Sequence, residues 1–390
     1  MEIKKPIYLD NHATTPVDPR VMEAMIPYFT EVFGNPASKN HTYGNEAFKA
    51  VEESREILAK AIKARSQEII FTSGATESIN LAIKGVALAN QTRGKHFITV
   101  ATEHKAVLDC YEWLAANGFE TTILPVNTDG LLDPAQVASA IRSDTILVSV
   151  MAANNEIGVI QPLKEIGKIC RDKNVYFMTD ATQALGKTPL DVQALHVDLL
   201  AASGHKVYGP KGIGFLYVRR SNPRVMIEPI IHGGGHEKGL RSGTLATPNI
   251  VGLAKAVEIA IKEMPEEQER IRKLRDQLLA CLLTAIPDAK VNGCLKQRLA
   301  GNLNIVFPGV ESEALMIALK SEIAVSSGSA CTTAAVLPSH VLKALGLSDA
   351  QSHSSIRIGL GRFTEQGDLA QAAARVAVEL NRLSGFHSAA

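Results

Sequence analysis

The chain has 390 residues, a formal net charge of +1, 46% hydrophobic residues and 21% charged residues. This composition is typical of a soluble globular protein that is long enough for one large domain and a smaller one. The balanced charge argues against direct binding to nucleic acid or to an anionic membrane, and no apolar run has the roughly 18 residues that a membrane span needs.

The five cysteines are odd in number, and no two have the spacing of a metal-binding pair or of a redox CxxC motif. We therefore expect free thiols in a reducing cytoplasm and no metal site. Cys281 lies within the apolar sequence LLACLLTAI, and we expect it to be a small buried core residue.

From about residue 50 to residue 260, helical patterns alternate with short apolar runs. The first helix, 50–64, places Val51, Leu58 and Ile62 roughly on one face. Seven apolar runs follow that are typical of buried strands: 68–72, 96–101, 121–126, 145–151, 175–179, 198–203 and 214–219. This alternation predicts an α/β fold in which helices cover both faces of a mostly parallel sheet.

After Pro265 the pattern changes to that of a smaller α/β unit. The elements expected there are a helix at 266–285, a strand at 303–307, a helix at 312–322, a strand at 323–327, a helix at 339–345, a strand at 355–360 and a helix at 364–383. We predict a large domain over residues 16–262 and a small domain made of residues 1–15 and 263–390.

Polar residues follow the predicted strands where a parallel sheet would bind a ligand, at the carboxyl ends. Thr76 opens a helix whose free N–H groups would form an anion site. The others are His104, Asn155, Asp180, Gln183 and Lys206. Taken singly, each has a structural explanation as a helix cap, a turn residue or a surface lysine.

Together these residues predict a site for pyridoxal phosphate. Lysine can form a Schiff base with an aldehyde, a buried carboxylate keeps the ring nitrogen protonated, an aromatic side chain stacks on the ring, and a helix start holds the phosphate. The sequence has neither a nucleotide-binding G-x-G-x-x-G with a matching acidic residue nor a Walker A motif, so a nucleotide fits less well.

Cys331 lies in VSSGSACTT, residues 325–333. Its neighbours are small residues and glycine, which suit a mobile and accessible segment better than a packed core. We therefore interpret Cys331 as a reactive thiol rather than as a small buried apolar residue.

The chain resembles cysteine desulfurases of the NifS/IscS type, which are fold-type I enzymes that use pyridoxal phosphate. The resemblance runs nearly end to end and is specific because all of its motifs occur in order. The motifs are YLDNHATTPVDPRV, FGNPAS, FTSGATESIN, TEHKAV, NNEIG, DATQALGK, SGHKVYGPKGIG, RSGT, SSGSACTT and SIRIGLGRFT.

The resemblance implies roles around the cofactor ring. Lys206 would hold the cofactor and, with His104, move the Cα proton, while His104 would also stack on the ring. Asp180 would pair with the ring nitrogen, and Gln183 would bond the phenolic oxygen. The residues implied for the phosphate are Ala75, Thr76, Ser203 and His205.

Further roles implied by the resemblance concern the substrate and a second subunit. Asn155 would contact the cofactor or the substrate L-cysteine, and Arg357 would bind the substrate carboxylate. Cys331 would take up the sulfur as a persulfide while L-alanine leaves. Thr244 would reach the phosphate of the neighbouring subunit, which implies a homodimer with shared sites. The sulfur would pass to acceptor proteins, among them an iron–sulfur scaffold.

Two alternatives stay open. One is another enzyme of the same fold, a selenocysteine lyase or an aminotransferase, which would share Lys206 and Asp180 but would not need Cys331. The other is a cofactor-free relative that acts as a partner or regulator, although Lys206, Asp180 and His104 are all in place. Many IscS-type members carry a longer tail that docks a scaffold, whereas this chain ends in LNRLSGFHSAA, so the acceptor stays open.

Overall fold

The structure is a computed structural model that describes residues 6–327 and 337–387, and Cys331 lies outside the described residues. Its main sheet has seven strands in the order β2-β8-β7-β6-β5-β3-β4. The strands are β2 (Ile69–Thr72), β3 (His96–Val100), β4 (Glu120–Leu124), β5 (Thr145–Ser149), β6 (Tyr176–Asp180), β7 (Leu199–Ser203) and β8 (Gly214–Val218). The neighbours from β4 to β7 pair in parallel, and β8 runs antiparallel to both β7 and β2. The predicted mostly parallel sheet is confirmed.

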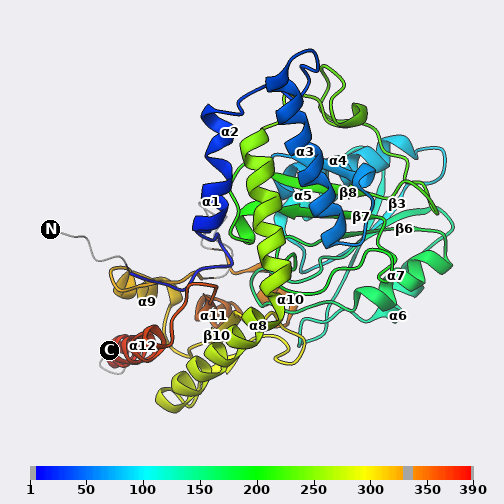
Figure 1. Ribbon diagram of the computed structural model, residues 1–390. Coiled ribbons are helices and arrows are strands. Elements are labelled where there is room, and N and C mark those ends of the chain that lie inside the picture. The colour runs from blue at the N-terminus through cyan, green and yellow to red at the C-terminus, as the bar shows by residue number, and fades with distance from the viewer. Residues whose placement is uncertain (1–5, 328–336, 388–390) are drawn as a thin grey trace.

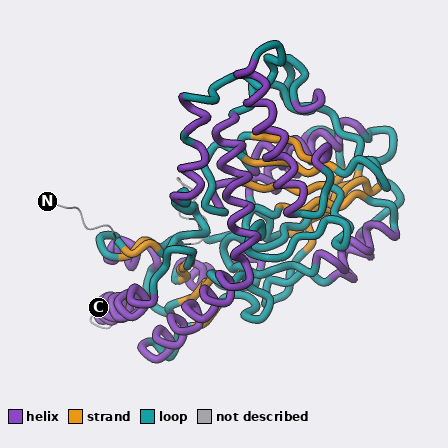
Figure 2. Tube along the Cα trace, in the orientation of Figure 1, coloured by secondary structure: helices purple, strands orange, loops and turns teal. Residues whose placement is uncertain are grey.

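Helices cover both faces of this sheet, so that the strands form a middle layer (Figure 2). These helices are α3 (Thr42–Ala61), α4 (Ala75–Ala89), α5 (Lys105–Ala116), α6 (Pro134–Ala140) and α7 (Leu163–Asp172). Alternate strand residues enter two cores: Phe97 packs with α4 and α5, and Ile98 packs with α3 and α7. Except for the edge strand β4, these strands are buried on both faces and are therefore mostly apolar runs, which is why the sequence located them within about two residues.

A second, smaller unit has its own core. Its sheets are β12-β10-β9, which is antiparallel, and the parallel pair β1-β11. Its elements are β1 (Ile7–Tyr8), β9 (Lys290–Val291), β10 (Asn302–Val306), α9 (Ser312–Leu319), β11 (Ile323–Ala324), α10 (His340–Ala344), α11 (Asp349–His353), β12 (Ser355–Gly359) and α12 (Gln366–His387). Leu9 belongs to this core, although it lies near the N-terminus.

Short elements complete the described chain. They are α1 (Pro19–Met25), α2 (Pro27–Thr30), η1 (Ser66–Glu68), η2 (Gly204–Lys206) and η3 (Glu237–Gly239). Among the residues described, no helix combines the length and the apolar character needed to cross a membrane.

One long helix, α8 (Thr247–Ala285), joins the two units, with Pro265 inside it. The prediction that a separate helix begins at 266 is therefore wrong. A proline inside a helix costs about 3 kcal/mol, because it removes one hydrogen bond and crowds the preceding turn. The helix continues because each half buries an apolar stripe, Ile250 and Leu253 in the large core and Leu274 and Leu278 in the small one. Figure 1 shows α8 changing direction between the units. The predicted boundary between the large and the small domain, at residues 262 and 263, stays a prediction.

The prediction for Cys281 is also wrong. The thiol is exposed on α8, whereas Leu278 and Leu282 on either side of it are buried. The buried apolar residues of this half-helix are spaced by three or four residues along one face, and Cys281 lies beside that face rather than on it.

A buried ion pair anchors η3 to the large unit. The Arg55 and Glu237 side chains are 6% and 2% exposed, and two N–O contacts of 2.8 Å join them. Glu237 also accepts the backbone N–H of Phe71 on β2 at 2.7 Å, so its carboxylate links α3, β2 and the segment that leads to Thr244.

We expect Glu237→Ala to lower the free energy of unfolding by about 3–5 kcal/mol, because it removes the buried partner of Arg55, leaving only the half-exposed Glu52 at 3.0 Å, and it also removes the acceptor of the Phe71 N–H. The double variant Arg55→Met/Glu237→Leu should recover most of that loss, since both charges are then gone. Urea unfolding of the three proteins measures the difference. A loss under about 1 kcal/mol in Glu237→Ala would contradict the interpretation that its buried ion pair with Arg55 stabilises the fold.

Candidate active site

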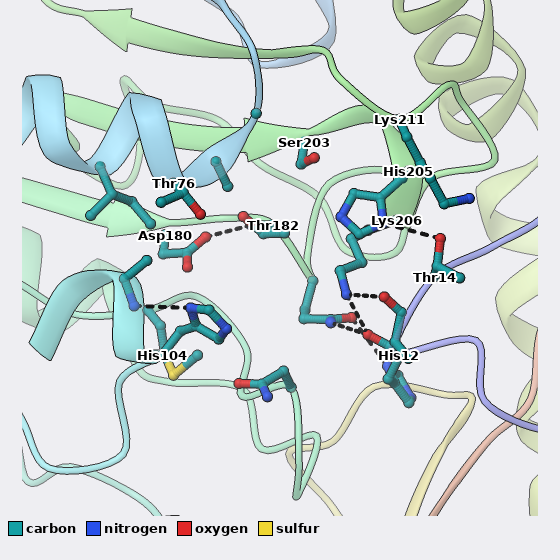
Figure 3. A pocket seen from close by; sticks show the side chains of 18 of the residues that line it. His12, Thr14, Thr76, His104, Asp180, Thr182, Ser203, His205, Lys206 and Lys211 are labelled. Atoms are coloured by element: carbon teal, nitrogen blue, oxygen red, sulfur yellow. Dashed lines mark hydrogen bonds between the residues drawn. The ribbon is translucent and has the colours of Figure 1, made fainter. Parts of the chain in front are cut away.

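One cavity of about 530 Å³ opens where the parallel strands of the large sheet end. The polar or charged residues lining it include His12, Thr14, Thr76, His104, Asn155, Asp180, Gln183, Ser203, His205, Lys206, Lys211 and Arg357. Figure 3 shows how the labelled side chains converge from different elements. All the predicted cofactor and substrate residues except Thr244 line this cavity. Their individual roles stay predictions.

Lys206 ends the short helix η2, directly after β7. Its Nζ donates to the backbone carbonyl of His12 at 2.7 Å and to that of Ala13 (Figure 3). The two carbonyls hold the amine at the floor of the cavity. An amine fixed inside a cavity can attack a carbonyl compound that binds there.

Asp180 is the last residue of β6 and is 5% exposed. Its Oδ1 accepts the backbone N–H of Thr182 at 2.9 Å, which fixes the carboxyl group at the start of the following turn. This geometry is compatible with Asp180 as the cap of the following turn. It is also compatible with Asp180 as a cofactor-binding residue, because the same side chain lines the cavity. A carboxylate in this position suits a protonated ring nitrogen.

His104 caps α5: its Nδ1 accepts the backbone N–H of Ala106 at 3.1 Å. Burial lowers the pKa of His104, and the Asp180 charge opposes that shift. Since Nδ1 acts as an acceptor, the neutral ring carries its hydrogen on Nε2. The imidazole is thus a neutral, oriented ring that can stack on a planar group and accept a proton.

The N-terminus of α4 forms one wall of the cavity. Gly74 precedes it without a side-chain cap, and Ala75, Thr76 and Ser203 line the cavity beside it. A Cβ on Gly214 would lie 2.4 Å from the Ala202 carbonyl oxygen, so only glycine lets β8 approach β7 this closely beside the cavity. Uncapped N–H groups with two hydroxyls nearby suit a phosphate group.

His205 lines the cavity, and its Nδ1 is 3.1 Å from the hydroxyl of Thr14. Burial lowers the pKa of His205 from 6.5 to about 4, and the charges of Lys206, Lys211 and Lys187 add to the effect. The ring is therefore neutral near pH 7.

The His205 shift predicts acid sensitivity of the protein without cofactor. Below its ordinary pKa of 6.5 the unfolded ring binds a proton, whereas the folded ring does so only near pH 4. Unfolding thus takes up a proton, and stability should fall as the pH drops from about 6.5 to about 4. We expect His205→Asn to remove about 1–2 kcal/mol of this fall, allowing for partial exposure. Urea unfolding at pH 7 and at pH 5 measures how much free energy of unfolding is lost between the two pH values. An equal loss in His205→Asn and in the wild type would contradict the prediction.

Arg357 enters the cavity from β12 of the small unit and is 2% exposed. It donates from Nη2 to the Asp10 carboxylate at 2.8 Å and from Nη1 to the Asn155 carbonyl at 3.1 Å. The guanidinium is thus fixed by both units. This suits the predicted contact with a substrate carboxylate.

The structure does not place two predicted residues at this cavity. Thr244 is exposed and is not among the residues that line the cavity of its own chain. Cys331 lies outside the described residues, so the structure places neither its thiol nor its loop.

Sequence reasoning missed His12. This residue is 3% exposed, and its Nδ1 lies 3.1 Å from Gln183 Oε1, while its carbonyl accepts from Gln183 Nε2 at 2.9 Å. Burial, then the charge of Lys187, keeps the pKa of His12 well below its usual range. The motif DNHATTP contains the residue, but nothing in the motif indicates a contact with a residue 171 positions further along the chain.

Comparison with known proteins agrees with this geometry. A family model described as aminotransferase class-V matches residues 7–371. The protein named cysteine desulfurase IscS of Rickettsia bellii (strain OSU 85-389) is 53% identical over 378 residues, which are 97% of this chain and 92% of that protein.

Two solved structures are similar along almost the whole chain. One, titled NifS-like protein, has a TM-score of 0.91 and 38% identity and covers 97% of this chain and 100% of its own. The other, titled SspA in complex with cysteine, has a TM-score of 0.81 and 38% identity. It covers 92% of this chain and 99% of its own. The chain belongs to the aminotransferase class-V family and, within it, to the cysteine desulfurases of the IscS/NifS type.

Proposed function

We propose that this chain is a cysteine desulfurase that depends on pyridoxal phosphate and converts L-cysteine to L-alanine while it passes the sulfur on. The observation that carries the proposal is the convergence of the Lys206 amine, the Asp180 carboxyl group and the His104 ring on one cavity beside a helix N-terminus. The similar structure that contains cysteine supports L-cysteine as the substrate.

The residues of the cavity fit pyridoxal phosphate. When bound, this cofactor supplies an aldehyde that condenses with amines and a ring that stores the electron pair left on a substrate carbon. The start of α4, with Thr76 and Ser203, would hold its phosphate. Asp180 would pair with its ring nitrogen, and Lys206 would bind it covalently.

Four side chains of the protein would act on the substrate, each in a different role. Arg357, held by Asp10 and by the Asn155 carbonyl, binds and orients the substrate carboxylate. Lys206 removes the proton from the substrate Cα, and His104, whose Nδ1 is occupied by the Ala106 N–H, uses Nε2 for proton transfer. The Cys331 thiolate forms an S–S bond to the substrate sulfur as the substrate Cβ–S bond breaks, which gives a persulfide on Cys331. The electron pair of the broken bond stays with the remaining fragment, which is protonated to become alanine.

We also propose a homodimer. Thr244 is exposed and lies outside its own cavity, which is compatible with a contact to the phosphate of a second copy. Large apolar side chains are exposed on and around α1, α2 and the start of α3: Met22, Ile26, Phe29, Phe33, Tyr43 and Phe48. A second copy of the chain would cover such a surface.

The proposed location is the cytoplasm, and the proposed acceptors are proteins of iron–sulfur cluster assembly or of other sulfur-using pathways. The four described cysteines, Cys110, Cys170, Cys281 and Cys294, are free, which suits a reducing compartment.

The test is a product analysis of the cofactor-loaded enzyme with L-cysteine as the sole substrate and a thiol reductant present. We expect alanine and sulfide in equal amounts. A requirement for a keto-acid acceptor would favour the aminotransferase, and turnover of selenocysteine without turnover of cysteine would favour the lyase. Failure to bind pyridoxal phosphate would favour the cofactor-free alternative.

A further inference from the structure

A carboxylate lies at the end of the cavity where the cofactor phosphate is expected. Glu77 is the third residue of α4 and lines the cavity together with Ala75 and Thr76. Its Oε2 accepts the backbone N–H of Ser73 at 2.7 Å, which holds the carboxylate at the first turn of the helix. The proposed mechanism gives Glu77 no function.

The Glu77 carboxylate is ionised near neutral pH. Burial alone would raise the pKa of Glu77, but the hydrogen bonds from Arg241 and Ser73 outweigh that effect, and the pKa is lowered. A negative charge in the first turn of a helix interacts favourably with the helix dipole. The same charge disfavours a second anion there, and a phosphate monoester carries a charge between about −1.5 and −2 near pH 7. Glu77 therefore opposes the anion site that α4 otherwise provides.

Few positive charges on the cavity wall can offset Glu77. Among the described residues that line the cavity, the lysines and arginines are Lys206, Lys211 and Arg357. Lys206 would join the cofactor, and Arg357 is already paired with a carboxylate at 2.8 Å. His205 is neutral near pH 7, since its pKa is about 4. Lys211 is then the remaining cation of the described wall, and the charge of Glu77 would cancel it.

The Arg241 guanidinium pairs with this carboxylate from outside the cavity. Its Nε donates to Glu77 Oε1 at 2.8 Å and its Nη2 to Oε2 at 3.4 Å. The Arg241 and Glu77 side chains are 20% and 11% exposed, so the pair is largely shielded from water. The Ser73 N–H fixes the position of the carboxylate but has no net charge. Of these two partners, Arg241 is therefore the one that offsets the charge.

We propose that Arg241 is a positioning residue for the cofactor phosphate, which it favours indirectly by offsetting the negative charge of Glu77 at the start of α4. The inference rests on the proposed function, because it requires pyridoxal phosphate to bind with its phosphate at this helix start. Arg241 itself is not among the described residues that line the cavity. Its effect should therefore depend both on the Glu77 charge and on the presence of the phosphate group.

A purely structural role of the pair leads to a different expectation for Glu77. Arg241 precedes Thr244 by three residues, so the pair would in that case anchor the segment that carries Thr244. Removing either partner would break the anchor and weaken cofactor binding. With charge compensation, loss of Arg241 weakens binding, whereas loss of the Glu77 charge does not. The two single variants therefore separate the two explanations.

The test titrates the full chain, freed of cofactor, with pyridoxal phosphate and with pyridoxal, which lacks the phosphate. The visible absorption of the cofactor on Lys206 reports binding. Arg241→Met should weaken binding of pyridoxal phosphate roughly 10-fold and leave binding of pyridoxal within about twofold, because only the former brings an anion to Glu77. Arg241→Lys keeps the charge and should stay within about threefold of the wild type for both ligands. An unchanged preference for pyridoxal phosphate in Arg241→Met, or in Arg241→Gln if the first variant does not fold, would overturn the proposal.

Glu77→Gln completes the comparison. Its amide oxygen can still accept the Ser73 N–H, and the variant should bind pyridoxal phosphate at least as tightly as the wild type. In Arg241→Met/Glu77→Gln the affinity should return to within about threefold of the wild type, since the uncompensated charge is gone. Weaker binding in Glu77→Gln, or no recovery in the double variant, would show that the pair acts as an anchor, and the proposal would be wrong.

The titration also separates this inference from the proposed function. A wild type that does not bind pyridoxal phosphate would overturn both. Normal binding by the wild type, with no effect of Arg241→Met, would overturn the role of Arg241 alone. No cysteine is present, so the result is independent of whether the enzyme desulfurates cysteine.

Discussion

Lys206→Ala is expected to lower the rate of alanine formation on the order of 10⁴-fold or more. The variant loses both the amine that joins the cofactor and the base that moves the substrate proton, and each of these contributions is large. No other described lysine is held in this way by the carbonyls of His12 and Ala13. Alanine formation from L-cysteine, measured at matched cofactor content, gives the loss.

A lysine from the same loop provides the control for Lys206→Ala. Lys211 lines the same cavity, and Lys211→Ala removes an equal charge without removing the amine at the cavity floor. We expect a change of several-fold at most. Borohydride reduction should attach the cofactor to the peptide that contains Lys206 in the wild type and in Lys211→Ala, but not in Lys206→Ala. Attachment to another lysine in the wild type would contradict the assignment.

Asp180→Asn is expected to slow the reaction about 100- to 1000-fold. The amide keeps an oxygen that can accept the Thr182 N–H, so the local fold should persist, but the negative charge is gone. Losing one partner of a buried ion pair costs about 3–5 kcal/mol, and tenfold in rate corresponds to about 1.4 kcal/mol.

The matched variant is Asp180→Glu, which restores the charge in a longer side chain. It should regain part of the rate lost in Asp180→Asn when both are compared at equal cofactor content. A rate for Asp180→Asn within tenfold of the wild type would show that the carboxylate is only the cap of the following turn.

The strands that build the site could be predicted because their residues are buried on both faces. The runs before Thr76, His104 and Asp180 are nearly uninterrupted apolar stretches, and parallel strands bring their carboxyl ends to one edge. The assembly of these side chains around one cavity follows from that rule and from the resemblance to a known family.

Contacts between distant segments could not be predicted in the same way. His12 reaches the site because the N-terminal segment bridges to β12 at Asp10 and Gly359, and no local pattern encodes that pairing. Arg357 likewise meets Asp10 over 347 positions. Such partners are set by tertiary packing, which leaves no periodic signal in the sequence.

Two local predictions failed because tertiary packing overrode them. Pro265 is a helix breaker by its chemistry, yet α8 continues through it because two cores hold its two halves. Cys281 has apolar neighbours, yet it lies beside the buried stripe of that helix.

The start of helix α3 differs for a local reason. The helix begins at Thr42, earlier than its apolar pattern, because the His41 ring caps it by accepting the Gly44 N–H.

The most direct test of the proposed desulfurase is mass spectrometry of the Cys331 peptide after the cofactor-loaded enzyme has received L-cysteine without reductant. We predict a gain of one sulfur on Cys331, absent before substrate and accompanied by alanine. The exposed thiol of Cys281 serves as the internal control and should not gain sulfur in step with alanine. Consumption of cysteine without sulfur on Cys331, or equal labelling of both thiols, would contradict the account and favour a lyase or aminotransferase in which Cys331 takes no part.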